Sequence, residues 1–78
     1  MSFSTVKKSY KALNVSFTET KMTIFFEDGR ELSTPLEWFP RLRNATSEQL
    51  SKWRLIGDGE GIHWEEMDED ISVEKLLE

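Results

Sequence analysis

The sequence predicts a small α+β domain: an antiparallel β-meander of three to four strands with two or three short helices packed on one side. Three observations support this class. Apolar and polar residues alternate in the first third, two helix-start signals follow, and one more short apolar segment lies near the end. With 78 residues the chain suits one domain. We therefore expect residues 1–78 to form one domain, with 1–9 as a leader and about 10–77 as its core.

The first half predicts a meander of three strands. Residues 13–18 alternate apolar with polar side chains, and residues 22–27 do so except at Phe25; such alternation is typical of a half-buried strand. Asp28-Gly29 supplies the left-handed backbone of a tight hairpin, and residues 30–33 leave it as a third strand. The residues expected on the buried faces are Leu13, Val15, Phe17, Met22, Ile24 and Phe26.

A first helix start is predicted at residues 34–37. Thr34 can cap, Pro35 sits where its missing N–H costs nothing, and Glu37 completes a capping box. Pro40 prevents continuation, so a single turn is expected that places Leu36, Trp38 or Phe39 in the core.

A second helix start is predicted at Thr46, because Gln49 follows three residues later. This helix should run to about Trp53, with Leu50 and Trp53 on one face. Residues 55–56 should then lead into a loop.

The last third predicts one strand and one helix. The glycine-spaced residues 57–61 form a turn, and 62–64 form a final strand with Ile62 and Trp64 inward and His63 solvated on the outer face. Asp70 or Ser72 caps a terminal helix. The residues expected to dock this helix on the sheet are Val73, Leu76 and Leu77.

The composition bounds the setting of the protein. There is no cysteine, hence no disulfide and no thiolate metal site, and a small domain without such bonds is typical of the cytoplasm. No segment approaches the roughly 20 apolar residues of a membrane span, and the N-terminus does not have the apolar core of a signal peptide. We expect a cytoplasmic protein without a membrane partner; nothing in the sequence predicts its oligomeric state.

Charge divides the chain unevenly. Residues 58–78 carry nine carboxylates and one lysine, whereas residues 1–57 carry nine Lys or Arg against six Asp or Glu. This segregation predicts an interaction module with an acidic face for a basic protein partner, of an antitoxin-like or regulatory kind. The predicted contact residues are Glu65, Glu66, Asp68, Glu69 and Asp70. The alternative explanation is that the acids from Asp68 to Asp70 only favour the N-terminus of the last helix.

A basic group offers a second functional hypothesis. Cations interleaved with aromatic side chains can bind single-stranded nucleic acid, although the net charge of −5 opposes it. The alternative is that the aromatic residues belong to the hydrophobic core and the cations only line a solvent-exposed rim. The candidate contacts are Arg41, Arg43, Lys52 and Arg54, which flank Trp38, Phe39 and Trp53.

No residue pattern predicts catalysis, a metal or a cofactor. His63 is the only histidine, so any general base or mixed metal site would depend on it. Residues 68–72 have the opening of a calcium loop, but Val73 occupies the position that needs glycine. Residues 57–61 contain two acids that would repel phosphate. We therefore expect the protein not to be an enzyme.

Four segments together resemble the bacterial family called domain of unknown function 2442, from about Tyr10 to Leu77. They are F-F-E-D-G-R-E-L, T-P-L-E-W-F-P-R-L-R-N-A-T-S-E-Q-L, G-I-H-W and D-E-D-I-S-V-E-K-L-L, in this order. Relatives commonly have proline where this chain has Glu65. The resemblance implies a small α+β fold without established activity. It also implies a companion of small toxin-like proteins in bacterial gene pairs, here without the helix-turn-helix that some members append.

Overall fold

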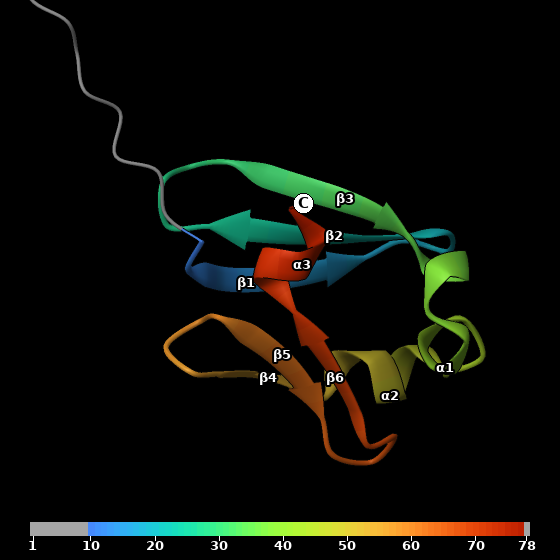
Figure 1. Ribbon diagram of the computed structural model, residues 1–78. Helices are drawn as coiled ribbons and strands as arrows, with labels where there is room; N and C mark the ends of the chain where they lie inside the picture. Colours follow the sequence, from blue (N-terminus) through green and yellow to red (C-terminus); the bar gives the residue numbers. More distant parts are fainter. Residues whose placement is uncertain (1–9, 78) are drawn as a thin grey trace, which may run out of the picture.

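The computed structural model describes residues 10–77, which form two three-stranded antiparallel sheets (Figure 1). The first sheet has the order β1-β2-β3, with β1 Ala12–Phe17, β2 Lys21–Phe26 and β3 Glu31–Pro35. The second has the order β4-β5-β6, with β4 Trp53–Ile56, β5 Gly61–Trp64 and β6 Glu69–Ser72. The helical segments are η1 Leu36–Trp38, α1 Pro40–Arg43 and α2 Ser47–Ser51 between the sheets, and α3 Val73–Leu76 after β6.

The α+β class and the N-terminal meander are confirmed, but the predicted number of strands is too low. Residues 10–77 contain six strands in two sheets rather than three or four in one. Two strands were not predicted. β4 begins at Trp53, which its spacing from Leu50 assigned to the preceding helix, and β6 has only one apolar residue, Ile71, so it shows no alternation. The predicted packing of the helices on one side is not confirmed, since η1, α1 and α2 lie in the connection between the sheets (Figure 1).

The first hairpins follow the predicted pattern except at Leu13. Gly29 has φ +93°, and Phe26 donates its amide to the Arg30 carbonyl at 2.9 Å, which closes the hairpin at the predicted place. Leu13 is 52% exposed, because a register shift between Ala12 and Asn14 turns Ala12 inward in its place. The other predicted inward residues of β1 and β2 are buried, or half-buried in the case of Phe17.

The first predicted helix is a single 3-10 turn, and its predicted capping box does not form. Thr34 is instead a buried residue of β3 paired with Met22, and Pro35 ends the strand. The N-cap of η1 is Pro35, whose ring has no hydrogen-bonding group, so no side chain caps this turn. Leu36 enters the core as expected, whereas Trp38 is 66% exposed.

The second predicted helix, α2, begins as predicted but ends earlier. Thr46 accepts from the amide of Gln49, and the Gln49 side chain accepts from the amide of Thr46, so the capping box is complete. The helix ends at Ser51, and Trp53 begins β4 instead of continuing the helix. Leu50 and Trp53 both contact the core, but they do so from different elements, α2 and β4. Their three-residue spacing therefore does not mark one face of a helix.

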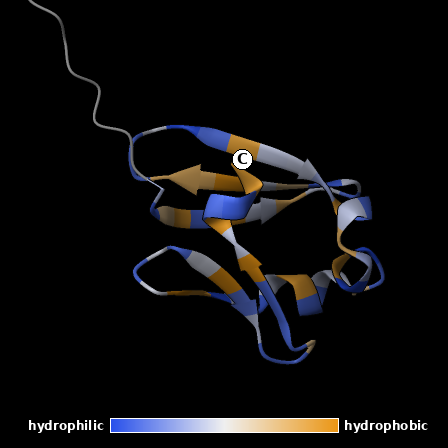
Figure 2. Ribbon diagram, in the orientation of Figure 1, coloured by the Kyte–Doolittle hydropathy of each residue, from blue (hydrophilic) through white to orange (hydrophobic). Residues whose placement is uncertain are grey.

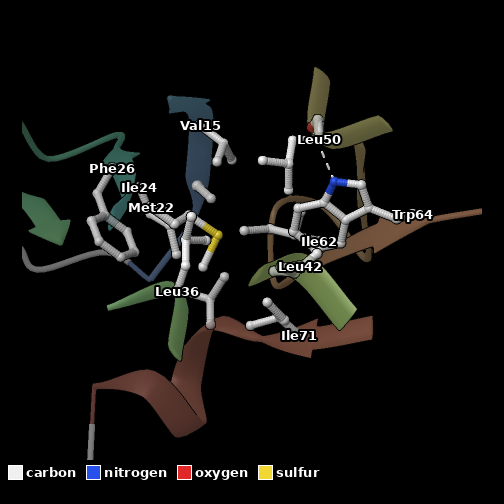
Figure 3. Close-up of a cluster of buried hydrophobic side chains, with 12 residues drawn as sticks. Val15, Met22, Ile24, Phe26, Leu36, Leu42, Leu50, Ile62, Trp64 and Ile71 are labelled. Atoms are coloured by element: carbon white, nitrogen blue, oxygen red, sulfur yellow. Dashed lines mark hydrogen bonds between the residues drawn. The ribbon is translucent and has the colours of Figure 1, made fainter. Parts of the chain in front are cut away.

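The two sheets enclose one hydrophobic core between them. In Figure 3 the side chains of Val15 and Met22 from the first sheet point toward Ile62 and the second sheet. Ile62 and Trp64 are fully buried, as predicted. The Trp64 indole donates to the Leu50 carbonyl at 3.1 Å, which fixes α2 against the second sheet (Figure 3). The remaining buried apolar residues are Ala12, Ile24, Phe26, Leu36, Leu42, Ile71 and Val73.

Candidate functional site

The β5–β6 hairpin gathers all five carboxylates that the sequence predicts as partner contacts. Strand register places His63 opposite Asp70 and Trp64 opposite Glu69. The connecting turn 65–68 is closed by the Asp68 amide on the Glu65 carbonyl at 3.3 Å, and Asp68 has φ +51°. The hairpin is largely hydrophilic in Figure 2. Its carboxylates are Glu65, Glu66, Asp68, Glu69 and Asp70.

The alternative explanation of this acidic run as a helix N-terminus is wrong. Helix α3 begins at Val73, and Ser72 is its N-cap, accepting from the Lys75 amide. Glu69 and Asp70 lie before it in β6, where they belong to a strand ladder. A helix dipole acts within the first turn, so stabilisation of α3 does not account for the acids of the turn and β6.

Two of the four predicted nucleic-acid contacts pair with carboxylates of the hairpin. Arg54 Nη2 lies 2.9 Å from Glu65 Oε1. Lys52 Nζ lies 3.8 Å from Glu66 Oε2 and 3.5 Å from Glu48 Oε1. Gln49 also donates to Glu66, at 3.2 Å. The acidic and basic candidate surfaces are therefore interleaved rather than separate faces.

The other two predicted nucleic-acid contacts, Arg41 and Arg43, differ from each other. Arg41 Nη1 donates to the carbonyl oxygens of Met67 and Asp68 at 3.1 and 3.0 Å, so it holds the tip of the hairpin. Arg43 is exposed and pairs with no carboxylate among residues 10–77. Within the described part of the chain, only Arg43 of the four is left unengaged.

His63 is not the solvated strand residue that the sequence predicts. Its side chain is 16% exposed, and its Nδ1 pairs with Asp70 Oδ1 on the neighbouring strand. On the other neighbouring strand, β4, Arg54 lies opposite His63. The prediction failed because Asp70 or Ser72 was expected to cap the terminal helix, so no strand was expected beside β5; Ser72 is the cap, and Asp70 lies in β6. Residues 10–77 contain no group of three His, Cys, Asp or Glu side chains placed to hold a metal ion.

A groove lined by both apolar and polar residues lies beside β1, and no sequence pattern indicates it. Its volume is about 730 Å³, and its walls come from the second half of β1, from the α1–α2 segment and from Trp53. These segments are far apart along the chain, so no local pattern could predict the groove. Arg43 lies on its rim.

Within residues 10–77 no helix is both long and apolar enough to span a bilayer.

Comparison with known proteins places the chain in a family. A family model described as a protein of unknown function (DUF2442) matches residues 12–78. The chain belongs to this DUF2442 family. No curated protein matches it. The crystal structure of a protein of unknown function from Rhodospirillum rubrum ATCC 11170 is similar, with a TM-score of 0.75 and 26% identity. The match covers 86% of this chain and 83% of that one, which supports the two-sheet fold of this DUF2442 protein.

Proposed function

We propose that this DUF2442 protein is a small non-catalytic interaction module that binds a basic protein partner through the β5–β6 hairpin. The observation that carries the proposal is the gathering of five carboxylates on one short hairpin. The side chains of Glu65 and Asp70 are 72% and 66% exposed, so the charge is accessible. A concentrated acidic surface speeds association with a basic protein and selects against acidic ones.

The ion pairs within the hairpin region are compatible with this function. Arg54, Lys52 and their carboxylate partners are all exposed, and exposed pairs contribute about 0–1 kcal/mol each. A partner's lysines and arginines can therefore exchange with them at small cost. Arg41 supports the hairpin from its main-chain side and leaves the carboxylates of the tip available.

The role proposed for such a binder is antitoxin-like or regulatory, in the cytoplasm. This assignment rests on the resemblance to companions of toxin-like proteins and on the lack of cysteine. The nucleic-acid alternative has less support, because Arg41, Lys52 and Arg54 already engage groups of the same chain. Only Arg43 of that set favours it.

The proposal is tested by charge reversal after the partner has been captured from the native bacterium by cross-linking. The double variant Glu65→Lys with Glu66→Lys should slow association with the purified partner about tenfold and flatten its salt dependence. The matched control reverses Glu31 and Glu37, two exposed carboxylates outside the hairpin. Binding that survives the hairpin reversal but is lost in Arg41→Glu with Arg43→Glu would favour the nucleic-acid alternative.

A further inference from the structure

We propose that the groove beside β1 receives an extended segment of the partner, which adds as a further strand to the edge of the first sheet. This inference rests on the proposed function, because the segment is taken to belong to the same basic protein. It assigns a second contact surface, separate from the acidic hairpin.

The main chain of β1 is open at its second half. β1 is an edge strand, and Thr18 donates its amide to the Lys21 carbonyl of β2 at 2.8 Å. Main-chain groups alternate in direction along an antiparallel strand, so those of Val15 and Phe17 point away from β2. No described residue hydrogen-bonds the outward N–H and C=O of Phe17.

The first half of β1, by contrast, is protected against strand addition. The register shift between Ala12 and Asn14 disrupts its edge, and the amide of Val15 is satisfied by the Asn14 side chain at 2.9 Å. Natural edge strands commonly carry such protection. This protection is absent around Phe17, so the unprotected part of the edge is the part that borders the groove.

The groove suits the side chains of an added strand. Strand addition gains affinity from main-chain hydrogen bonds and specificity from pockets for alternate side chains. A groove of about 730 Å³ lies within the range of ligand sites. Its apolar lining residues are Val15, Phe17, Leu36, Leu42, Ala45, Leu50 and Trp53.

Charge restricts the segment to one with an apolar centre and a basic flank. On the rim, Glu19 and Arg43 offset each other, so the groove itself favours neutral side chains. One side of α2 lines the groove through Ser47 and Leu50, and another part of it reaches the acidic hairpin through Gln49. A helix is about 10 Å wide, which an extended chain crosses in about three residues. Basic residues at that separation would reach the hairpin carboxylates.

The experiment uses the full chain and a blocked peptide of the sequence Thr-Val-Thr-Val-Thr-Lys-Lys-Lys, observed by nuclear magnetic resonance. We expect saturable shifts of the Phe17 amide and the Trp53 indole, and exchange of the Phe17 amide with solvent slowed by about tenfold. The same peptide N-methylated at both valines should not bind, because it cannot pair with the edge. Equal binding of the methylated peptide, or no shift at Phe17 at millimolar peptide, overturns the inference.

Two exposed positions give matched variants. Ser47→Phe fills the groove from its rim and should weaken peptide binding by at least about tenfold. Asn44→Phe adds the same side chain at an exposed position that does not line the groove, and should leave binding unchanged. If the two variants bind the peptide equally well, the groove is not its site and the inference fails.

Other occupants of the groove give distinct results. Shifts at Phe17 that depend on protein concentration without peptide would assign the groove to a second copy of the chain. Binding of octanoate that is lost in Arg43→Gln, without peptide binding, would assign it to an apolar carboxylate.

With the captured partner, loss of binding in the hairpin reversal but not in Ser47→Phe overturns this inference and leaves the proposed function standing. The reverse result overturns the proposed function alone.

Discussion

The amide of Ala12 donates a hydrogen bond to the carbonyl of Gly59 at 2.9 Å and thereby joins the start of the first sheet to the β4–β5 turn of the second. Gly59 has φ +86°, and a Cβ built on it would lie 2.7 Å from the Ala12 carbonyl oxygen. The close approach of the two segments at this point requires a residue without a side chain.

Gly59→Ala should therefore lower the free energy of unfolding by about 2–4 kcal/mol, from backbone strain together with the clash against main chain. The matched control is Gly57→Ala in the same turn. Gly57 also has positive φ, but its nearest contacts are 3.6 Å away on the Glu60 side chain, so only the strain of about 1–2 kcal/mol applies. Urea denaturation of both variants measures the difference; equal losses would show that the contact with Ala12 does not restrict this site.

Lys11 gives this junction a pH dependence. The hydrogen bond and charge of Asp58, and then the charge of Glu27, raise the pKa of Lys11 above its ordinary value. The charged lysine thus stabilises the fold fully below that ordinary value, and the contribution is lost as pH rises through the higher folded pKa. The urea midpoint of Lys11→Met should fall below that of the wild type at neutral pH and approach it in strong alkali. A gap that stays constant across this range would contradict the effect.

The parts of the fold that the sequence predicts are those set by local rules. The Asp28-Gly29 turn and the Thr46–Gln49 capping box depend on neighbouring residues, and both form as expected. The alternation of Ile62 and Trp64 also places both in the core. Register, by contrast, depends on partners: the bulge that exposes Leu13 is a property of the β1–β2 pair, which no single strand encodes clearly.

The candidate site shows the same division. The uneven distribution of charge along the sequence indicates the acidic residues. Their arrangement on a hairpin depends on β6, a segment that the sequence predicts as the approach to a helix. Without β6 no strand was expected beside His63 to supply Asp70. Without β4 there was no reason to expect Arg54 to lie beside β5 and meet Glu65. The groove beside Phe17 was not predictable, since it needs two sheets and their connection in place.

Gly29→Val tests the first hairpin. Gly29 has φ +93°, which a β-branched residue resists, although no atom would lie within 4 Å of an added Cβ. We expect a loss of stability of at least about 1 kcal/mol, measured as a lower thermal midpoint. Gly29→Asn should lose less, because asparagine tolerates positive φ. An unchanged midpoint in Gly29→Val would mean that strain at this turn does not limit stability.

Metal ions should leave the stability of the protein unchanged. The calcium-like residues 68–72 run into strand β6, where Asp70 pairs with His63 instead of turning toward a cation. Thermal unfolding with and without zinc, calcium or manganese measures the effect. A reproducible rise in melting temperature that disappears in His63→Ala or Asp68→Ala would contradict this prediction.

Thr34 is a place where the protein can be stabilised. Its side chain is buried in β3, and its hydroxyl has no hydrogen-bond partner among residues 10–77. Burial of an unsatisfied hydroxyl costs about 1–3 kcal/mol, and valine has nearly the same shape without the polar group. Thr34→Val should therefore raise the free energy of unfolding by about 1 kcal/mol or more.

The matched control is Thr23→Val, one strand away. The Thr23 hydroxyl is bonded to the Ser33 hydroxyl at 2.8 Å on the exposed face of the same sheet, so its removal relieves no buried polar group. Valine has a good β-propensity at both positions, which cancels that contribution in the comparison. Chemical denaturation should show a gain for Thr34→Val and little change or a small loss for Thr23→Val. If the two substitutions have equal effects, the gain comes from strand propensity, and the Thr34 hydroxyl is not a cost to the fold.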